Sequence, residues 1–178
     1  MTTNEHHTTP AGEPAATRDE VVVGIDESPA SEAALRWAAA HSLATGLPLR
    51  LVRTWQMSAL ASAAVTAGAA DYLEATAADA RARATRWVLD TLGGDAAEVR
   101  WTLEVHEGGA GPVLVALSHG SRLVVVGTHE HTGLRRAVSG SVSHYVLSHA
   151  DMPVVAVPAP VGQERARAQD AMVMGPLL

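Results

Sequence analysis

A polar segment between a valine-rich run and a later helix combines residue types that could bind an anion. Gly127 follows the valines, and Gly140 and Ser141 begin the predicted helix. The free N–H groups at a helix N-terminus carry roughly half a positive charge, which suits a phosphate, and glycine lets the phosphate approach the backbone. Arg135 and Arg136 could supply further positive charge. The alternative is that the glycines are only turn residues and that a serine only caps the helix.

Two other loops are expected at the same edge of the sheet. Asp26 follows the run Val21–Ile25, and Thr54 ends the run Leu49–Thr54. Ligands of open parallel sheets bind beyond the carboxyl ends of the strands, where Asp26 could accept a hydrogen bond from a ribose hydroxyl or a base amine. We predict no metal site, because His129 and His131 supply at most two of the three or four ligands that zinc needs. We also predict no catalytic residues, since no convincing pair of base and nucleophile is present.

These residues must be positioned by an alternation of strands and helices. The expected strands are Val21–Ile25, Leu49–Thr54, Val99–Val105, Leu123–Val126 and Val154–Val157. The expected helices run from Ser28-Pro29 to Gly46, from Ala69 to Leu92, from Pro112 to Ser118, and from Gly140 to just before Asp151. Such alternation predicts a single doubly wound, Rossmann-like α/β domain with a parallel sheet. Because Phe is absent, we expect an aliphatic core with the four Trp as its largest side chains, and Arg81, Arg83 and Arg86 on a solvated helix face.

Composition excludes several classes of protein. The chain has 178 residues, which is one domain's worth, and it contains no Cys and no Lys, so disulfides, thiolate sites and the lysine-dependent P-loop are ruled out. A net charge of −6 argues against general binding to nucleic acids or anionic membranes.

No window is apolar enough to span a membrane and residues 1–19 lack a secretory signal pattern, so we expect a cytoplasmic protein. Residues 1–19 are expected to form a disordered tail, and residues 159–178 a second tail.

Three stretches together resemble the universal stress protein family. They are VVVGIDESPASEAALRWA, LRLVRTW and SRLVVVGTHEHTGLRRAVSGSVSHYVLSHADMPVVAV, and the similarity covers roughly residues 20–158. The resemblance implies a five-stranded parallel sheet in the order 3-2-1-4-5 with four helices. It also implies homodimers formed through the last strand, Val154–Val157.

For one branch of the family, the resemblance further implies an ATP site. The motif is Gly, two residues, Gly, nine residues, Gly and then Ser or Thr, and its ends match Gly127 and Gly140-Ser141. The aspartate that contacts ribose matches Asp26, and the strand end that meets adenine falls near Thr54. Thr128 and Val142 adjoin these positions and complete the implied site. The implied ligand is ATP, with or without Mg²⁺, sensed or structural and with little or no hydrolysis.

Glu130 stands where the motif has its middle glycine. A positive φ at a non-glycine residue costs about 1–2 kcal/mol, and a carboxylate about 5 Å from a phosphate charge costs roughly 3 kcal/mol at an effective dielectric near 20. Together these costs weaken binding on the order of a thousandfold if the side chain points inward. Glu130 could instead face solvent or reach a Mg²⁺ on the phosphates. The alternative function is a nucleotide-free dimer that acts as a protein-interaction module, and weak ATP hydrolysis stays open.

Overall fold

A computed structural model describes residues 18–56, 69–128 and 141–160; the side chains of residues 69–73 are not described. The strands are β1 (Arg18–Ile25), β2 (Leu49–Trp55), β3 (Trp101–Glu107), β4 (Ser121–Thr128) and β5 (Val154–Pro158). The helices are α1 (Pro29–Thr45), α3 (Ala69–Leu92), α4 (Ala110–Ser118) and α5 (Ser141–His149), with a short 3-10 helix η1 (Gly93–Ala97). No helix in these ranges is long and apolar enough to cross a membrane.

The five strands form one parallel sheet in the order β3-β2-β1-β4-β5, as the sequence predicts. At its centre, Val23 of β1 pairs with Leu51 of β2 on one side and with Val125 of β4 on the other. Because all strands are parallel, their carboxyl ends lie along the same edge. The chain order reverses between β1 and β4, so this edge has a switch point beside β1.

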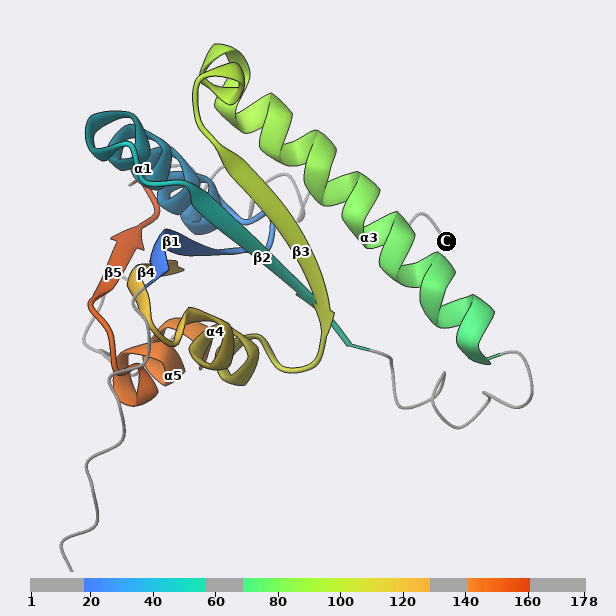
Figure 1. Ribbon diagram of the computed structural model, residues 1–178. Helices are drawn as coiled ribbons and strands as arrows, with labels where there is room; N and C mark the ends of the chain where they lie inside the picture. Colours follow the sequence, from blue (N-terminus) through green and yellow to red (C-terminus); the bar gives the residue numbers. More distant parts are fainter. Residues whose placement is uncertain (1–17, 57–68, 129–140, 161–178) are drawn as a thin grey trace, which may run out of the picture.

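Helices cover both faces of the sheet, with α1 and α3 on one face and α4 and α5 on the other (Figure 1). Alternate residues of β1 divide between the two layers. Val21 and Val23 pack with Leu35 of α1 and Val88 of α3, whereas Val22 packs in the cluster of α4 and α5. A strand buried on both faces reads as a continuous apolar run. The predicted doubly wound α/β fold is therefore confirmed.

Helix α1 begins and ends where the sequence predicts. The Oγ of Ser28 accepts a hydrogen bond from the N–H of Ser31 at 3.1 Å, and Pro29 occupies the first helical position. At the other end Gly46 adopts a left-handed conformation with φ 74° and its N–H donates to the Ser42 carbonyl. Both ends are thus satisfied by local contacts, which is why sequence patterns locate them well.

Several element boundaries differ from prediction. Strand β1 begins at Arg18 rather than Val21, within the expected tail of residues 1–19, and β4 begins at Ser121 rather than Leu123. The third strand begins at Trp101 rather than Val99, because η1 extends the chain beyond α3 and the Val99 N–H donates to the Asp95 carbonyl. Helix α4 begins at Ala110, two residues before Pro112. The first N–H groups of a helix have no partner within the helix, so a proline in the first turn is tolerated there.

The prediction of tryptophans as large core residues is wrong. The largest fully buried side chains are all aliphatic and include Leu35, Leu49 and Leu51. Trp37 is 37% exposed, and Trp87 and Trp101 are only partly buried beside the core. Helix α1 faces the sheet with Ala34, Ala38 and Ala39. These small side chains leave little space for an indole between helix and sheet.

The arginines of α3 are exposed as predicted, and one of them also bonds to the sheet. The guanidinium of Arg81 donates to the carbonyl of Leu103 in the edge strand β3 at 2.7 Å. Arg83 forms an exposed ion pair with Asp79 one turn away at 3.1 Å. The contact of Arg81 covers part of a strand edge that would otherwise carry an unpaired carbonyl.

A half-buried ion cluster joins three strands on the α4 side of the sheet. Arg50 of β2 donates from Nε and Nη2 to the two carboxylate oxygens of Glu104 in β3, both at 2.9 Å. Its Nη1 donates to Glu20 of β1 at 3.4 Å and to the carbonyl of Leu117 in α4 at 3.1 Å. His106 Nε2 lies 2.9 Å from the Glu104 carboxylate. The hydrogen bonds from Arg50 hold the pKa of Glu104 at about 2.

We predict that Glu104→Gln lowers the free energy of unfolding by about 1–2 kcal/mol at pH 7, a modest loss because solvent screens the pair. The pKa of Glu104 is lower in the folded than in the unfolded protein, where it is 4.5, so its stabilisation is complete above pH 4.5 and is lost as pH falls through about 2. Urea denaturation of both proteins across this pH range measures the effect.

Asp79→Asn is the matched control, because Asp79 belongs to an exposed helical ion pair and should change stability by less than about 0.5 kcal/mol. A stability difference for Glu104→Gln that stays constant down to pH 2 contradicts the assigned pKa. A difference no larger than that of Asp79→Asn contradicts the stabilising role of the cluster.

Candidate functional site

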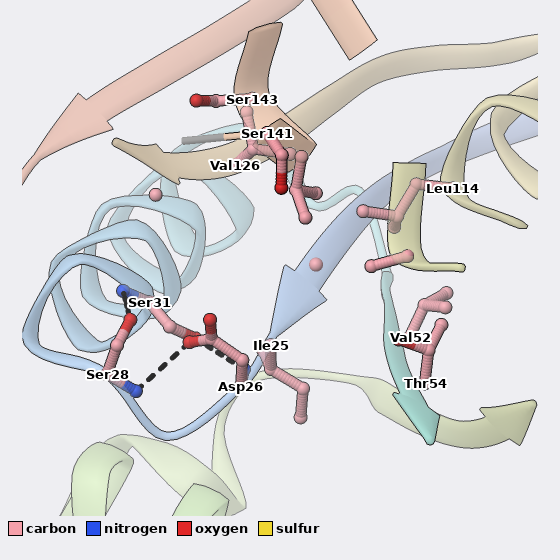
Figure 2. A pocket seen from close by; sticks show the side chains of 14 residues that line it. Ile25, Asp26, Ser28, Ser31, Val52, Thr54, Leu114, Val126, Ser141 and Ser143 are labelled. Carbon is pink, nitrogen blue, oxygen red and sulfur yellow. Dashed lines mark hydrogen bonds between the residues drawn. The ribbon is translucent and has the colours of Figure 1, made fainter. Parts of the chain in front are cut away.

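A cavity of about 210 Å³ lies at the carboxyl edge of the sheet, beside β1. Its walls come from the ends of β1, β2 and β4 and from the starts of α1, α4 and α5, as Figure 2 shows for the labelled side chains. The lining residues are Gly24, Ile25, Asp26, Ser28, Ser31, Val52, Thr54, Ala110, Leu114, Val126, Gly127, Ser141, Val142 and Ser143. The edge predicted from the sequence thus contains a cavity.

Asp26 is held in place by the turn that starts α1. Its carboxylate Oδ1 accepts a hydrogen bond from the Ser28 N–H at 3.0 Å, and its own N–H donates to the Oγ of Ser31 at 3.1 Å. Figure 2 shows these bonds together with the cap between Ser28 and Ser31. The two serines were not among the predicted site residues. The spacing of the polar residues in DESPAS is the signal that could have indicated them.

Glu27, next to Asp26, has a strained backbone. Its φ of 66° is the one positive value among non-glycine residues in the described ranges. A left-handed conformation costs such a residue about 1–2 kcal/mol. The Glu27 carboxylate lies 3.9 Å from Nε of Arg53, which links the loop after β1 to the end of β2. Strain of this kind is found at sites where the backbone must present a neighbouring group in one orientation.

Gly127 lies within β4 and packs directly against the first turn of α1. A Cβ at this position would lie 2.5 Å from the carbonyl carbon of Ala30, 2.6 Å from its oxygen and 2.7 Å from the nitrogen of Ser31. These are backbone atoms and cannot rotate away. The sequence predicts either close approach of an anion or a turn at this glycine. The structure adds a third reason for glycine, the packing of helix against strand.

The start of α5 forms the wall opposite Asp26. Ser141 and Val142, the first two residues of the helix, line the cavity together with the buried Ser143. Thr54 of β2 also lines it, and Thr128 follows Gly127 at the end of β4 without being a lining residue. The structure therefore brings together five of the predicted site residues: Asp26, Thr54, Gly127, Ser141 and Val142.

The other predicted residues lie outside the described part of the chain: Gly140, Glu130, Arg135 and Arg136, as well as His129 and His131. Within the described ranges no group of three or more His, Asp or Glu side chains is placed to hold a metal ion. Two histidines of α5, His144 and His149, are exposed. His149 stacks on Tyr145 with 4.0 Å between ring centroids.

The apolar wall of the cavity, to which α4 contributes, was not predicted from the sequence. Leu114 and Ala110 line it together with Val52 and Val126. Leu114 reaches the sheet because Gly24 has no side chain; a Cβ there would lie 2.8 Å from Leu114 Cδ1. An isolated glycine inside a strand is the signal for such close packing. The cavity therefore combines an apolar wall with one carboxylate, several hydroxyls and the N-terminus of α5.

The fold agrees with comparisons to known proteins. The model of the universal stress protein family matches residues 17–158, so the chain belongs to that family. A universal stress protein of Mycolicibacterium smegmatis is 31% identical over 149 residues, covering 80% of this chain and 49% of the relative. Universal stress protein Rv2623 of Mycobacterium tuberculosis is 32% identical, covering 77% of this chain and 46% of the relative. The chain thus spans about half the length of these curated relatives.

Solved structures share the fold at low sequence identity. UspA from Lactobacillus plantarum superimposes with a TM-score of 0.57 at 20% identity, covering 79% of this chain and 99% of that one. The universal stress protein of Archaeoglobus fulgidus in complex with dAMP has a TM-score of 0.51 at 17% identity, covering 79% and 98%. A universal stress protein in complex with cAMP has a TM-score of 0.51 at 19% identity, covering 82% and 100%.

We predict that Gly127→Ala destabilises the protein by about 1–3 kcal/mol even without any ligand, because the added methyl group overlaps the backbone of α1. Urea denaturation in nucleotide-free buffer measures the change. Gly94→Ala is the control, since a Cβ at Gly94 meets nothing within 4 Å. Equal stability of Gly127→Ala and the unmodified protein would show that the close packing of β4 on α1 is not required.

Proposed function

We propose that this chain binds ATP in the cavity at the carboxyl edge of the sheet, as a sensed or structural ligand with little or no hydrolysis. The observation that carries the proposal is the meeting of Asp26, Thr54, Gly127, Ser141 and Val142 around one cavity. These residues come from four separate segments of the chain. The sequence and its family resemblance predict each of them as part of a nucleotide site.

Each part of a nucleotide has a suitable partner in the cavity. The side chains of Val52, Leu114 and Val126 offer apolar contact for a purine ring. The Asp26 carboxylate can accept hydrogen bonds from ribose hydroxyls. The N–H groups at the start of α5 and the hydroxyl of Ser141 can donate to phosphate oxygens. The dAMP and cAMP complexes of the structural relatives support the proposal.

The described lining also supports retention of the nucleotide rather than turnover. Asp26 is its one carboxylate, and the described lining contains no His that could act as a general base. The Asp26 carboxylate already accepts the N–H of Ser28. Mg²⁺ would be held chiefly by the phosphates, as is usual for this ion. Hydrolysis of ATP by more than one turnover per site would contradict this part of the proposal.

We predict that Asp26→Ala weakens ATP binding about 10- to 100-fold, the loss expected for hydrogen bonds to a charged group. Calorimetry with Mg-ATP up to millimolar concentration measures the affinity. Asp26→Asn keeps an acceptor for the Ser28 N–H and removes the charge, so it should lose less. Asp90→Ala, which removes an exposed carboxylate of α3, is the control and should bind as the unmodified protein does.

Absence of heat and of a thermal shift with millimolar Mg-ATP would overturn the proposal. Equal affinities for Asp26→Ala and Asp90→Ala would place the nucleotide elsewhere. The affinity of the unmodified protein also tests the predicted weakening of binding by Glu130, a residue that lies outside the described ranges. Binding at micromolar ATP would show that its carboxylate does not impose the predicted cost.

A second candidate is a nucleotide-free homodimer that acts as a protein-interaction module. The position of β5 at the edge of the sheet favours pairing, because Val154–Val157 carries no charge and an unpaired apolar edge invites association. We propose that both candidates dimerise through this strand. Light scattering at micromolar concentration should give twice the mass of one chain, and a monomer would contradict the pairing. ATP that remains bound through purification would decide against the nucleotide-free function.

A further inference from the structure

The sheet has two edge strands, and they differ in length. Strand β3 at one edge has seven residues, Trp101–Glu107, and β5 at the other has five. The outer side of an edge strand carries N–H and C=O groups that can pair with a strand of another molecule. Among the described residues, no strand pairs with the outer side of β3. Other contacts must therefore decide whether this longer edge stays unpaired.

The backbone groups of β3 divide between its partner β2 and the free edge. Just before β3 begins, the carbonyl of Arg100 accepts a hydrogen bond from the N–H of Leu49 at 2.8 Å. Just after it ends, the N–H of Gly108 donates to the carbonyl of Trp55 at 2.9 Å. Since the backbone groups of successive residues in a strand point to opposite sides, the even-numbered residues face β2. The outward-facing residues in the first five positions of β3 are therefore Trp101, Leu103 and Val105.

Arg81 of α3 occupies the middle of this free edge. Helix α3 runs beside β3 (Figure 1), and Nη1 of Arg81 donates a hydrogen bond to the carbonyl of Leu103 at 2.7 Å. Leu103 lies between the other two outward-facing residues, Trp101 and Val105. A hydrogen bond from a charged donor is stronger than one between neutral groups. A strand that pairs along this edge must therefore displace the guanidinium from Leu103.

Strand β3 is otherwise suited to pairing with the β3 strand of a second copy of the chain. Antiparallel pairing about a two-fold axis at Leu103 places Trp101 of one copy opposite Val105 of the other. It also places Thr102 opposite Glu104, so no like charges face each other in this stretch. In this register the two Leu103 residues exchange hydrogen bonds through their N–H and C=O groups. That exchange needs the carbonyl that Arg81 occupies.

We propose that Arg81 blocks the association of two copies of the chain through β3. Each copy carries its own guanidinium at the Leu103 carbonyl, so pairing has to displace two charged donors together. Both groups would also lie near the two-fold axis of the pair, where like charges repel. This block acts at the opposite edge of the sheet from β5 and does not depend on nucleotide binding.

Arg81→Ala tests the block. We expect the association constant through β3 to rise about 100-fold, about tenfold for each of the two charged hydrogen bonds that pairing no longer displaces. Light scattering from micromolar to millimolar concentration should give a larger mass for Arg81→Ala than for the unmodified protein. A monomeric protein would become a dimer, and a protein already paired through β5 would form longer assemblies.

Two further variants separate the lost hydrogen bond from other effects of the change. Arg83→Ala removes the same charge from the same helix, where Arg83 forms an exposed ion pair with Asp79, and should keep the mass of the unmodified protein. Arg81→Met keeps an unbranched apolar side chain without donors, so it should associate as Arg81→Ala does. Thermal unfolding verifies that each variant is folded.

Hydrogen exchange locates the new contact. The N–H groups of Trp101, Leu103 and Val105 should exchange more slowly in the assembled Arg81→Ala protein than in the unmodified protein, because pairing protects them. Adding Val105→Pro to Arg81→Ala should restore the original mass, since proline removes an outward N–H and no hydrogen bond to β2.

Equal masses for Arg81→Ala and the unmodified protein up to millimolar concentration would overturn the proposal. A larger mass without slower exchange at the three outward amides would also overturn it, because association would then use another surface. The same holds for an equal gain in mass in Arg83→Ala, or for an Arg81→Met protein that keeps the original mass.

Discussion

The close approach of α1 to the end of β4 is the constraint on which this structure depends most. Glycine at position 127 brings strand backbone against the backbone of Ala30 and Ser31. The same first turn of α1 holds Asp26 through Ser31 and Ser28. The place of the carboxylate is thus set by helix packing, not by the loop alone. A change at position 127 therefore acts on stability and on the site together.

Polar groups at the two ends of the sheet strands have opposite roles. The Arg50 cluster lies toward the amino ends, where guanidinium donors and carboxylates satisfy one another across three strands. At the carboxyl ends, hydroxyls and a carboxylate line a cavity instead. A mutually satisfied cluster gives cohesion, whereas groups that face a cavity are available to a ligand.

Much of the fold follows from local signals in the sequence. Ser28, Pro29 and Gly46 determine the two ends of α1 by short-range contacts. Apolar runs buried on both faces identify the strands of a parallel sheet. The order of the strands came from the family resemblance, because periodicity alone does not state which strands are neighbours. The start of β3 was misplaced, since a 3-10 turn has no strong sequence signal.

The site was predictable only in part, for a similar reason. Asp26 follows β1, Gly127 lies near the end of β4 and Ser141 begins α5. The rule that ligands bind at the carboxyl ends of parallel strands therefore identifies them. Leu114 and Ala110 enter the cavity through packing of α4 on the sheet, which depends on residues far away in sequence. The exposure of the tryptophans was misjudged because the space between two layers depends on the alanines of α1. Contacts of this kind appear only once the layers are assembled.

The cavity walls belong to both layers of the core. Ile25 packs with the layer of α1 and α3, whereas Val52, Leu114 and Val126 pack with the layer of α4 and α5. A molecule that fills the cavity would join the two layers as a common part of the interior. Binding then raises the free energy of unfolding, and at ligand concentrations well above Kd this increase grows with the logarithm of the concentration. The resistance of the folded chain to proteases would consequently rise with the concentration of the bound ligand.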